Sequence, residues 1–350
     1  MMVAQGWRVT AVAPDIDTGA AEVLTGLGAE PLSIKVVRKS MNPLADLAYW
    51  SALVRLFSIQ KPDVVFAYTI KPVIWGGLAA RVLGVPRIVA LITGLGFAFT
   101  DGAGAAGRQA IARTAASLLY RLALSRADRV LFQNPDDRDL FVRQRLVRDD
   151  GRIRVIDGSG VDLSHYGRVP LPDRPSFLAI ARLLGAKGVR EYAQAALTLK
   201  ATYPHAAFRL AGWIDPGPDS ISEDELQGWI DGGLEFLGRL SDVRPALALA
   251  RVFVLPSYRE GTPRSVLEAM AMGRAIVTSD APGCRETVVD GHNGFLVPPR
   301  ETEGLIRAME RFILEPALAD RMGEASSARA RERYDVHKVN ADILAAVLPD

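Results

Sequence analysis

Short apolar runs alternate with longer helical patterns along most of this chain. In the first half the runs are RVTAVAP (8–14), DVVFAYT (63–69), RIVALIT (87–93) and RVLFQN (129–134). Helical patterns lie between them, at 44–60, 73–84 and 108–126. Apolar strands that alternate with helices are typical of βαβ units around a parallel sheet that is buried on both faces. The sequence therefore predicts an α/β fold.

A segment rich in Pro and Gly, 157–175, interrupts this alternation, which then restarts. The later runs are SFLAIAR (176–182), AFRLAGW (207–213), LEFLG (234–238), RVFVLPS (251–257) and RAIVTSD (274–280). At 350 residues the chain exceeds one ordinary core. We therefore expect two facing doubly wound domains, 1–165 and 166–330, and a C-terminal helix, 331–350, that packs back on the first. Ligands of such sheets bind beyond the carboxyl ends of the strands.

Composition narrows the class of protein. Apolar residues make up 49% of the chain, which argues against disorder. No uninterrupted apolar run reaches about 18 residues, and the start lacks a signal-peptide pattern, so neither a membrane span nor secretion is expected. A single cysteine, Cys284, favours the cytoplasm, and the scattered histidines predict no zinc site. The basic excess within 1–165 fits phosphates, an anionic membrane or ordinary solvated charge; no nucleic-acid partner is expected.

The stretch PSYREGTPRSVLEAMAMGRAIVTS sets two glutamates, Glu260 and Glu268, on either side of an expected helix start. We expect Thr262 to cap this helix, Pro263 to occupy its first turn and Gly273 to end it. Glu260 then lies in the loop at the carboxyl end of the preceding strand. Glu268 lies about two turns into the helix.

This arrangement suits a ligand that carries a diphosphate. Backbone N–H groups of residues 263–265 are predicted to form an anion site with the helix dipole. Such a ligand could offer a sugar to Glu260 and a ribose to Glu268; solvated helix charge is the alternative reading of the same spacing. In SFLAIARLLGAKGV, Arg182 ends a strand and Lys187 sits in the following loop. Both cations suit a diphosphate, or they are surface charges beside a turn.

Together these motifs resemble glycosyltransferase family 4, the retaining enzymes of GT-B fold. The matching stretches are ARLLGAKGV, LGRLSDV, LPSYREGTPRSVLEAMAMGRAIVTSD and PGCRETVVDGHNGFLVPP. TIKPVIWGGLAA, ITGLGFAFT, FQNPDDRDLF and DGSGVDLSHY are similar to a bacterial subgroup of that family. The subgroup extends undecaprenyl-diphosphate-linked saccharides for capsule, O-antigen or protein glycosylation, often from UDP-N-acetylhexosamines.

The resemblance implies a role for each matching residue. Arg182 and Lys187 are expected to bind the donor diphosphate and to stabilise charge on the leaving nucleotide. Glu260 is the third expected catalytic residue and contacts the donor sugar, while Glu268 binds the ribose hydroxyls. The remaining expected donor-binding residues are Gly261, Thr262 and Pro263 against sugar and phosphate, Ser265 nearby, and Arg239 and Leu240 beside the base.

The resemblance also implies a reaction. The acceptor attacks the face of the sugar that the diphosphate leaves, and a phosphate oxygen takes the proton. Fixed cations and a helix terminus can neutralise the departing diphosphate, so no metal cofactor is expected. The expected substrates are a UDP-sugar donor and a polyprenyl-diphosphate-linked saccharide acceptor.

The chain departs from the family pattern at its start and in ITGLG. Many relatives have His before that first glycine, whereas this chain has Thr93, so no histidine base is expected there. The glycine-rich first turn is absent, and RVTAVAP reads as the second strand of its domain. We expect the missing first strand to leave an unpaired edge beside VVFAYT. The chain would then bind UDP but transfer sugar poorly.

Two acidic pairs are better explained by helix starts than by metal binding. Asp15-Ile16-Asp17 mimics the DxD motif of the other, metal-dependent transferase fold, yet it precedes a helix-like run and favours capping. Asp136 and Asp137 are expected to begin another helix for the same reason.

A basic amphipathic stretch, 108–126, admits two interpretations. Its arginines and apolar residues follow helical spacing: Arg108, Arg113, Arg121 and Arg126, with Ile111, Leu118, Leu119 and Leu122. It is either an interfacial helix, attached peripherally to the cytoplasmic face of the inner membrane, or a domain-packing helix with a basic outer face.

The favoured function is that of a hexosyltransferase that moves an N-acetylhexosamine or hexose from a UDP-sugar. Two alternatives stay open: a sugar-nucleotide epimerase of GT-B fold, and a sugar-nucleotide-binding protein that lacks catalysis because its first strand is missing.

Overall fold

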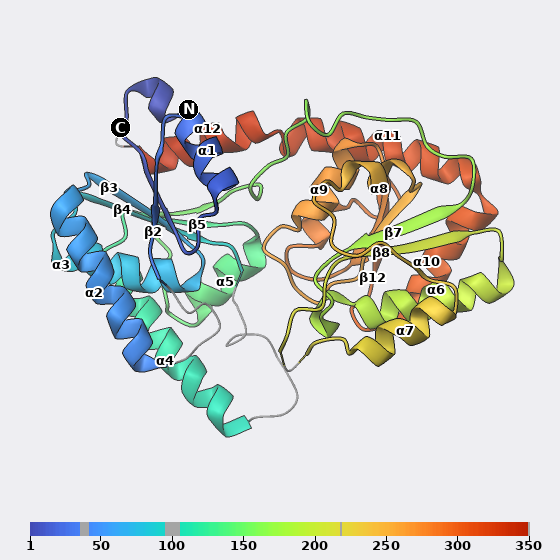
Figure 1. The fold of residues 1–350 in the computed structure, drawn as a ribbon, viewed down its shortest axis with the longest axis horizontal. Coiled ribbons are helices and arrows are strands. Elements are labelled where there is room, and N and C mark those ends of the chain that lie inside the picture. Colours follow the sequence, from blue (N-terminus) through green and yellow to red (C-terminus); the bar gives the residue numbers. More distant parts are fainter. Residues whose placement is uncertain (36–41, 95–105, 218, 349–350) are drawn as a thin grey trace. The chain divides into compact units, whose positions relative to one another are not determined.

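The computed structural model describes residues 1–35, 42–94, 106–217 and 219–348, and the side chains of 106–113 are outside that description. Backbone contacts divide the chain into two compact units (Figure 1). The first comprises residues 1–131, 140–154 and 343–350, and the second comprises 132–139 and 155–342.

Within its described residues the first unit has two sheets. β1 (Thr10–Ala13) and β2 (Glu30–Ser33) form a parallel pair. The other sheet has the order β3-β4-β5-β6, with β3 at one edge. The bounds of its strands are Val64–Tyr68, Arg87–Ile92, Arg129–Phe132 and Ile153–Val155. Each apolar run predicted for this half therefore contains a strand.

The helical patterns predicted for the first half are also confirmed. α2 spans Pro43–Gln60, a π-helical turn at Pro72–Gly76 continues into α3 (Gly77–Val82), and α4 spans Ala106–Leu124. Asp17 caps α1 (Thr18–Gly26) by accepting a hydrogen bond from the Ala20 N–H at 2.7 Å. The capping prediction for the Asp15–Asp17 pair is therefore confirmed.

The sheet of the second unit has, among the described residues, six strands in the order β12-β11-β10-β7-β8-β9. Their bounds are Gly294–Val297, Ala275–Ser279, Val252–Leu255, Ser176–Ile180, Ala207–Ala211 and Glu235–Phe236. All neighbours pair in parallel. From β7 the chain runs outward to β8 and β9 and then returns to β10 on the other side. This reversal is the switch point at which open α/β sheets bind ligands.

Alternate residues of these strands enter two separate cores. Phe177 of β7 packs with α6 (Val189–Thr202) and α10 (Thr302–Leu314), whereas the next residue, Leu178, packs with α9 (Arg264–Ala271). Figure 1 shows α6 and α10 on one side of the sheet and α9 on the other. The remaining helices are α5 (Pro135–Arg143), α7 (Glu223–Asp231), α8 (Arg244–Ala248), α11 (Pro316–Arg333) and α12 (Val336–Val347).

A fully buried arginine, Arg274, ties the segment that enters this domain to the amino ends of two strands. Its guanidinium donates to the carbonyl oxygens of Ala250, Met272 and Val169, at 2.6 Å for Ala250. No carboxylate pairs with it among the described residues, and burial lowers the pKa of Arg274 to about 10. Backbone carbonyls thus take the place of a counter-ion.

Replacing Arg274 with alanine is expected to loosen β10 and β11. The change leaves several buried carbonyl oxygens without a donor, and each such group costs about 1–3 kcal/mol, so we expect a loss of at least about 3 kcal/mol. Native-state hydrogen exchange at amides of the two strands measures it. Arg307→Ala, at a side chain that is 65% exposed, is the control and should change exchange little. Equal exchange in both variants would contradict this role for Arg274.

Candidate functional site

Two loops meet at the switch point, one after β7 and one after β10. The first contains a single 3-10 turn, Gly185–Lys187, followed by Gly188 at φ +68°. A Cβ on Gly188 would lie 2.1 Å from the carbonyl oxygen of Pro256 in the second loop. Any side chain here would force the loops apart. Glycine therefore allows Lys187 to reach Glu260.

Lys187 and Glu260 form a largely buried ion pair. Lys187 Nζ lies 2.5 Å from Glu260 Oε1, and the two side chains are 18% and 15% exposed. The Ser257 hydroxyl donates to the same carboxylate oxygen at 2.8 Å. The structure thus brings together two of the predicted site residues, which lie 73 positions apart in the sequence.

The backbone around Glu260 is fixed as well as its side chain. The Glu260 N–H donates to the Pro282 carbonyl at 2.9 Å, and the Asn134 amide donates to the carbonyls of Gly261 at 2.9 Å and Glu260 at 3.3 Å. Gly283, at φ +80°, lies so close to Glu260 that a Cβ there would be 2.2 Å from the backbone carbonyl oxygen of Glu260. The loop has little room to change its backbone conformation.

Asn134 belongs to a buried polar cluster that the sequence did not reveal. Its side-chain oxygen accepts from the Asp137 N–H at 2.8 Å, at the start of α5. The predicted helix start at Asp136 and Asp137 is therefore confirmed. Asp137, however, is fully buried and accepts from Arg259, the neighbour of Glu260, at 3.1 Å from Nε. Burial raises the pKa of Asp137, and Arg259 opposes that rise.

Arg182 is held by a carboxylate from the neighbouring strand. It follows β7, and its Nη1 lies 2.8 Å from Asp215, which follows β8. The Arg182 side chain is 45% exposed and that of Asp215 is 14% exposed. The cation is thus oriented by a buried partner and still faces solvent. Asp215 was not among the predicted site residues.

Four expectations for α9 are wrong. The helix begins at Arg264 with Pro263 as its N-cap, and Thr262 does not cap it, because its hydroxyl donates to the Gln133 carbonyl at 3.1 Å. Pro263 has no N–H, so the predicted anion site is reduced to the first helical N–H groups after it. Glu268 lies at the start of the second turn rather than two turns in. Gly273, at φ +80°, ends the helix as predicted.

The helix start is nevertheless held against the site. The Ser265 hydroxyl donates to the Ile180 carbonyl, at the carboxyl end of β7, at 3.3 Å. Gly261 is buried in the loop before α9. Arg239 and Leu240 follow β9, where Arg239 is exposed and Leu240 packs on the core beneath α9.

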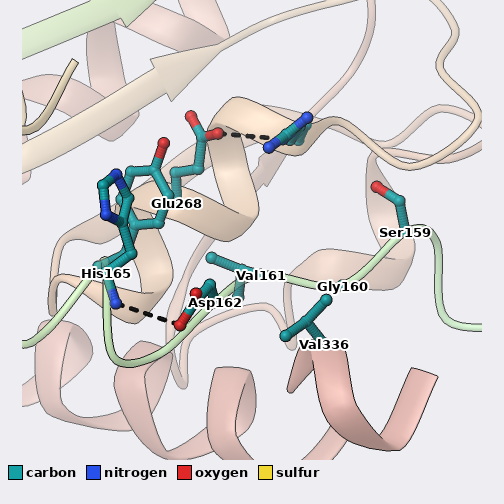
Figure 2. Close-up of a pocket in the computed structure, with 9 residues that line it drawn as sticks. Ser159, Gly160, Val161, Asp162, His165, Glu268 and Val336 are labelled. Carbon is teal, nitrogen blue, oxygen red and sulfur yellow. Dashed lines mark hydrogen bonds and ion pairs between the residues drawn. The ribbon is translucent and has the colours of Figure 1, made fainter. Parts of the chain in front are cut away.

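Glu268 is buried on α9 beside a cavity. Arg264 Nε lies 3.2 Å from its carboxylate, and the Tyr166 hydroxyl donates to the same group. Burial raises the pKa of Glu268. Figure 2 shows Glu268 with residues of the segment before β7, including Asp162 and His165. The cavity has a volume of about 320 Å³ and is lined by Ser159, Gly160, Val161, Asp162, His165, Tyr166, Arg264, Glu268 and Val336.

Some of the sequence expectations concern residues that the structure does not describe. Others concern a membrane-spanning helix and a metal site. Thr93 is half-buried after β4, but residues 95–100 of ITGLGFAFT lie outside the described residues. On α4, Leu118 and Leu122 are exposed, while the side chains of Arg108, Ile111 and Arg113 are not described. Across the described ranges no helix is long and apolar enough to cross a membrane. No group of three or more His, Cys, Asp or Glu side chains in those ranges is arranged to hold a metal ion.

Comparison with known proteins gives matches over both halves. Residues 174–315 match the family described as "Glycosyl transferases group 1", and residues 1–158 match "Glycosyl transferase 4-like domain". The N,N'-diacetylbacillosaminyl-diphospho-undecaprenol alpha-1,3-N-acetylgalactosaminyltransferase of Campylobacter jejuni is 30% identical over 296 residues, 81% of this chain and 76% of that protein. The UDP-Gal:alpha-D-GlcNAc-diphosphoundecaprenol alpha-1,3-galactosyltransferase of Escherichia coli is 25% identical over 291 residues, 78% and 72% of the two.

Among solved structures, Anabaena HepE in complex with UDP aligns with a TM-score of 0.74 at 19% identity, covering 98% of this chain and 93% of that chain. The fold is therefore GT-B, with two Rossmann-like domains built on parallel sheets. The chain belongs to the family-4 glycosyltransferases and is a hexosyltransferase. These relatives do not favour the two alternative functions, a sugar-nucleotide epimerase and a sugar-nucleotide-binding protein without catalysis.

Adjacent aspartates at the start of α5 should differ sharply in their effect on stability. Asp137→Ala removes the buried partner of Arg259, which typically costs about 3–5 kcal/mol. Asp136→Ala is the matched control, because Asp136 pairs with Arg285 at 2.7 Å where both side chains are over a third exposed, and it should cost under about 1 kcal/mol. Urea unfolding of the two variants compares them. Similar midpoints would show that the buried cluster does not hold the loop.

Proposed function

We propose that this glycosyltransferase transfers a hexose or N-acetylhexosamine from a UDP-sugar to a polyprenyl-diphosphate-linked saccharide, with retention of configuration and without a metal cofactor. The observation that carries the proposal is the meeting of Lys187 and Glu260 at the switch point. Both named relatives act on undecaprenyl-diphosphate-linked saccharides, and the name of one gives its donor as UDP-Gal. The Anabaena structure contains UDP.

Both cations of the site have donors left for a diphosphate. Lysine has three N–H donors and arginine has five, whereas Lys187 uses one contact for Glu260 and Arg182 uses Nη1 for Asp215. The first N–H groups of α9 point the same way as the helix dipole and favour an anion. Arg182, Lys187 and this helix start would together neutralise the leaving nucleotide diphosphate.

Glu260 is suited to hold the donor sugar beside that diphosphate. A carboxylate can accept several hydrogen bonds, so Glu260 can bind sugar hydroxyls while it keeps Lys187 and Ser257. Its fixed backbone would hold the sugar in one orientation and keep reorganisation small. The acceptor hydroxyl would then attack from the face that the diphosphate leaves and pass its proton to a phosphate oxygen. Glu268 would bind the ribose hydroxyls at the cavity beside α9.

We further propose that residues 1–165 act on the acceptor side and residues 166–330 bind the nucleotide sugar. A lipid-linked acceptor would bring the enzyme to the cytoplasmic face of the inner membrane. Exposed Leu118 and Leu122 lie one turn apart on α4, beside exposed Arg121, and this combination would suit peripheral contact with an anionic surface.

Removing either diphosphate cation is expected to weaken UDP binding. Truncating one partner of a charged contact costs about 2–5 kcal/mol, so Arg182→Ala and Lys187→Ala should each lower UDP affinity at least tenfold. Calorimetry with UDP measures the change, and Arg307→Ala, at an exposed side chain of α10, is the control. Unchanged affinity in both variants would refute this assignment of the diphosphate site.

Substitutions of Glu260 and Glu268 are expected to have different effects, one mainly on turnover and the other mainly on nucleotide binding. Glu260→Gln removes the charge beside the sugar, so turnover should fall about 100-fold while UDP affinity changes less, since one preorganised contact of this kind is worth about that much. Glu268→Ala should mainly weaken UDP, by about tenfold, because it loses ribose hydrogen bonds. Steady-state kinetics and calorimetry on both variants test the roles. The reverse pattern would contradict them.

A further inference from the structure

An exposed tryptophan lies one strand away from the proposed diphosphate site. Trp213 follows β8 and is 42% exposed, although its backbone is well fixed. Its carbonyl accepts from the Leu183 N–H at 2.9 Å, and Ile214 forms a β-bridge with Leu183. Leu183 directly follows Arg182. The loop that carries Trp213 is therefore bound to the segment that carries the diphosphate cation.

The ring of Trp213 contacts Arg239, which is itself one of the predicted donor-binding residues. The guanidinium carbon of Arg239 lies 5.0 Å from the ring centroid, a cation–π arrangement. Arg239 is exposed, and across the described residues no carboxylate is paired with it. The two side chains thus present a flat, cationic and aromatic surface to solvent. Such a surface suits a planar π system joined to a negative charge.

The strand order sets how far apart Arg182 and Arg239 lie at the sheet edge. β7, β8 and β9 are consecutive neighbours in the sheet, about 4.8 Å apart, so Arg182 and Arg239 leave the sheet edge about 10 Å from each other. Asp215 binds Arg182 at 2.8 Å and lies two residues after Trp213. One short loop therefore contacts the cation at the diphosphate end and the cation at the other end.

We infer that Trp213 is a further donor-binding residue: its indole ring and the Arg239 guanidinium form a platform on which the base of the donor nucleotide stacks. The inference rests on the proposed function, because a diphosphate at Arg182 is what brings a base to this platform. Stacking recognises the face of a base, so the platform itself accepts pyrimidines and purines alike. Discrimination between bases then falls to groups that meet the base edge.

The test compares three substitutions at one position. Trp213→Phe keeps a ring face, whereas Trp213→Leu and Trp213→Ala remove it. Calorimetry should show UDP affinity about tenfold lower for the last two, as for loss of a base–aromatic stack, and within about threefold of wild type for phenylalanine. Inorganic pyrophosphate, which has no base, should bind all variants alike. Leu249→Ala, which truncates an exposed side chain before β10, is the control and should bind UDP as wild type does.

Each outcome decides between the inference and the proposed function. If Arg182→Ala weakens UDP binding but all Trp213 variants bind as wild type does, the platform is wrong and the proposed function stands. If Trp213→Phe loses as much UDP affinity as Trp213→Leu, or if pyrophosphate binding falls as much as UDP binding, Trp213 stabilises the loop rather than binding the base. The inference then fails. If the folded wild-type protein binds neither UDP nor GDP, both the proposed function and the platform fail.

Discussion

Apolar helices cover both faces of the sheet in the second unit, and this burial decides where polar chemistry can occur. Val252 and Val254 of β10 face one core while Phe253 and Leu255 face the other, so no side chain of this strand can meet a ligand on a face. Polar groups reach solvent where the strands end. Because all neighbours are parallel, those ends share one edge, and the reversal beside β7 opens that edge between two loops. The proposed site is a consequence of sheet topology before it is a consequence of any particular residue.

The order of the Glu260 loop depends on polar groups that are themselves buried. Asn134 and Asp137 have no exposed surface, and a buried polar group is costly unless its partners are in place. Their partners here are the carbonyl of Gly261 and the guanidinium of Arg259, on either side of Glu260. The loop conformation that satisfies this cluster is therefore strongly favoured over its alternatives. Fixing the peptide in this way aims the Glu260 carboxylate without a regular secondary structure around it.

Strand and helix positions could be predicted from the sequence because they depend on the local periodicity of apolar residues. Part of the loop geometry was predicted as well, since residue type and turn context single out Glu260 and Lys187, and their side chains do meet. Thr262 was expected to cap α9 on local grounds, yet its hydroxyl donates to the carbonyl of Gln133, which lies 129 positions away in the sequence. Asp215 and Asn134 gave no signal as site residues for the same reason: each acts on a residue that is remote in sequence and becomes a neighbour through the sheet. Local rules describe elements well, whereas competition among distant polar partners is settled by tertiary structure.

Each cation of the proposed donor site is paired with a carboxylate, and this pairing affects what the site can select. Arg182 lies beside Asp215, Lys187 beside Glu260, and each pair has little net charge. A bare phosphate would therefore meet a weaker field than two unpaired cations would create. In the proposed site a nucleotide sugar would gain more, because it could add contacts at the sugar end through Glu260 while the diphosphate used the remaining N–H donors. Selectivity would then arise from simultaneous contacts along one ligand, since no single charge is strong enough alone. Pairing also keeps the side chains oriented, so less ordering is required when the donor binds.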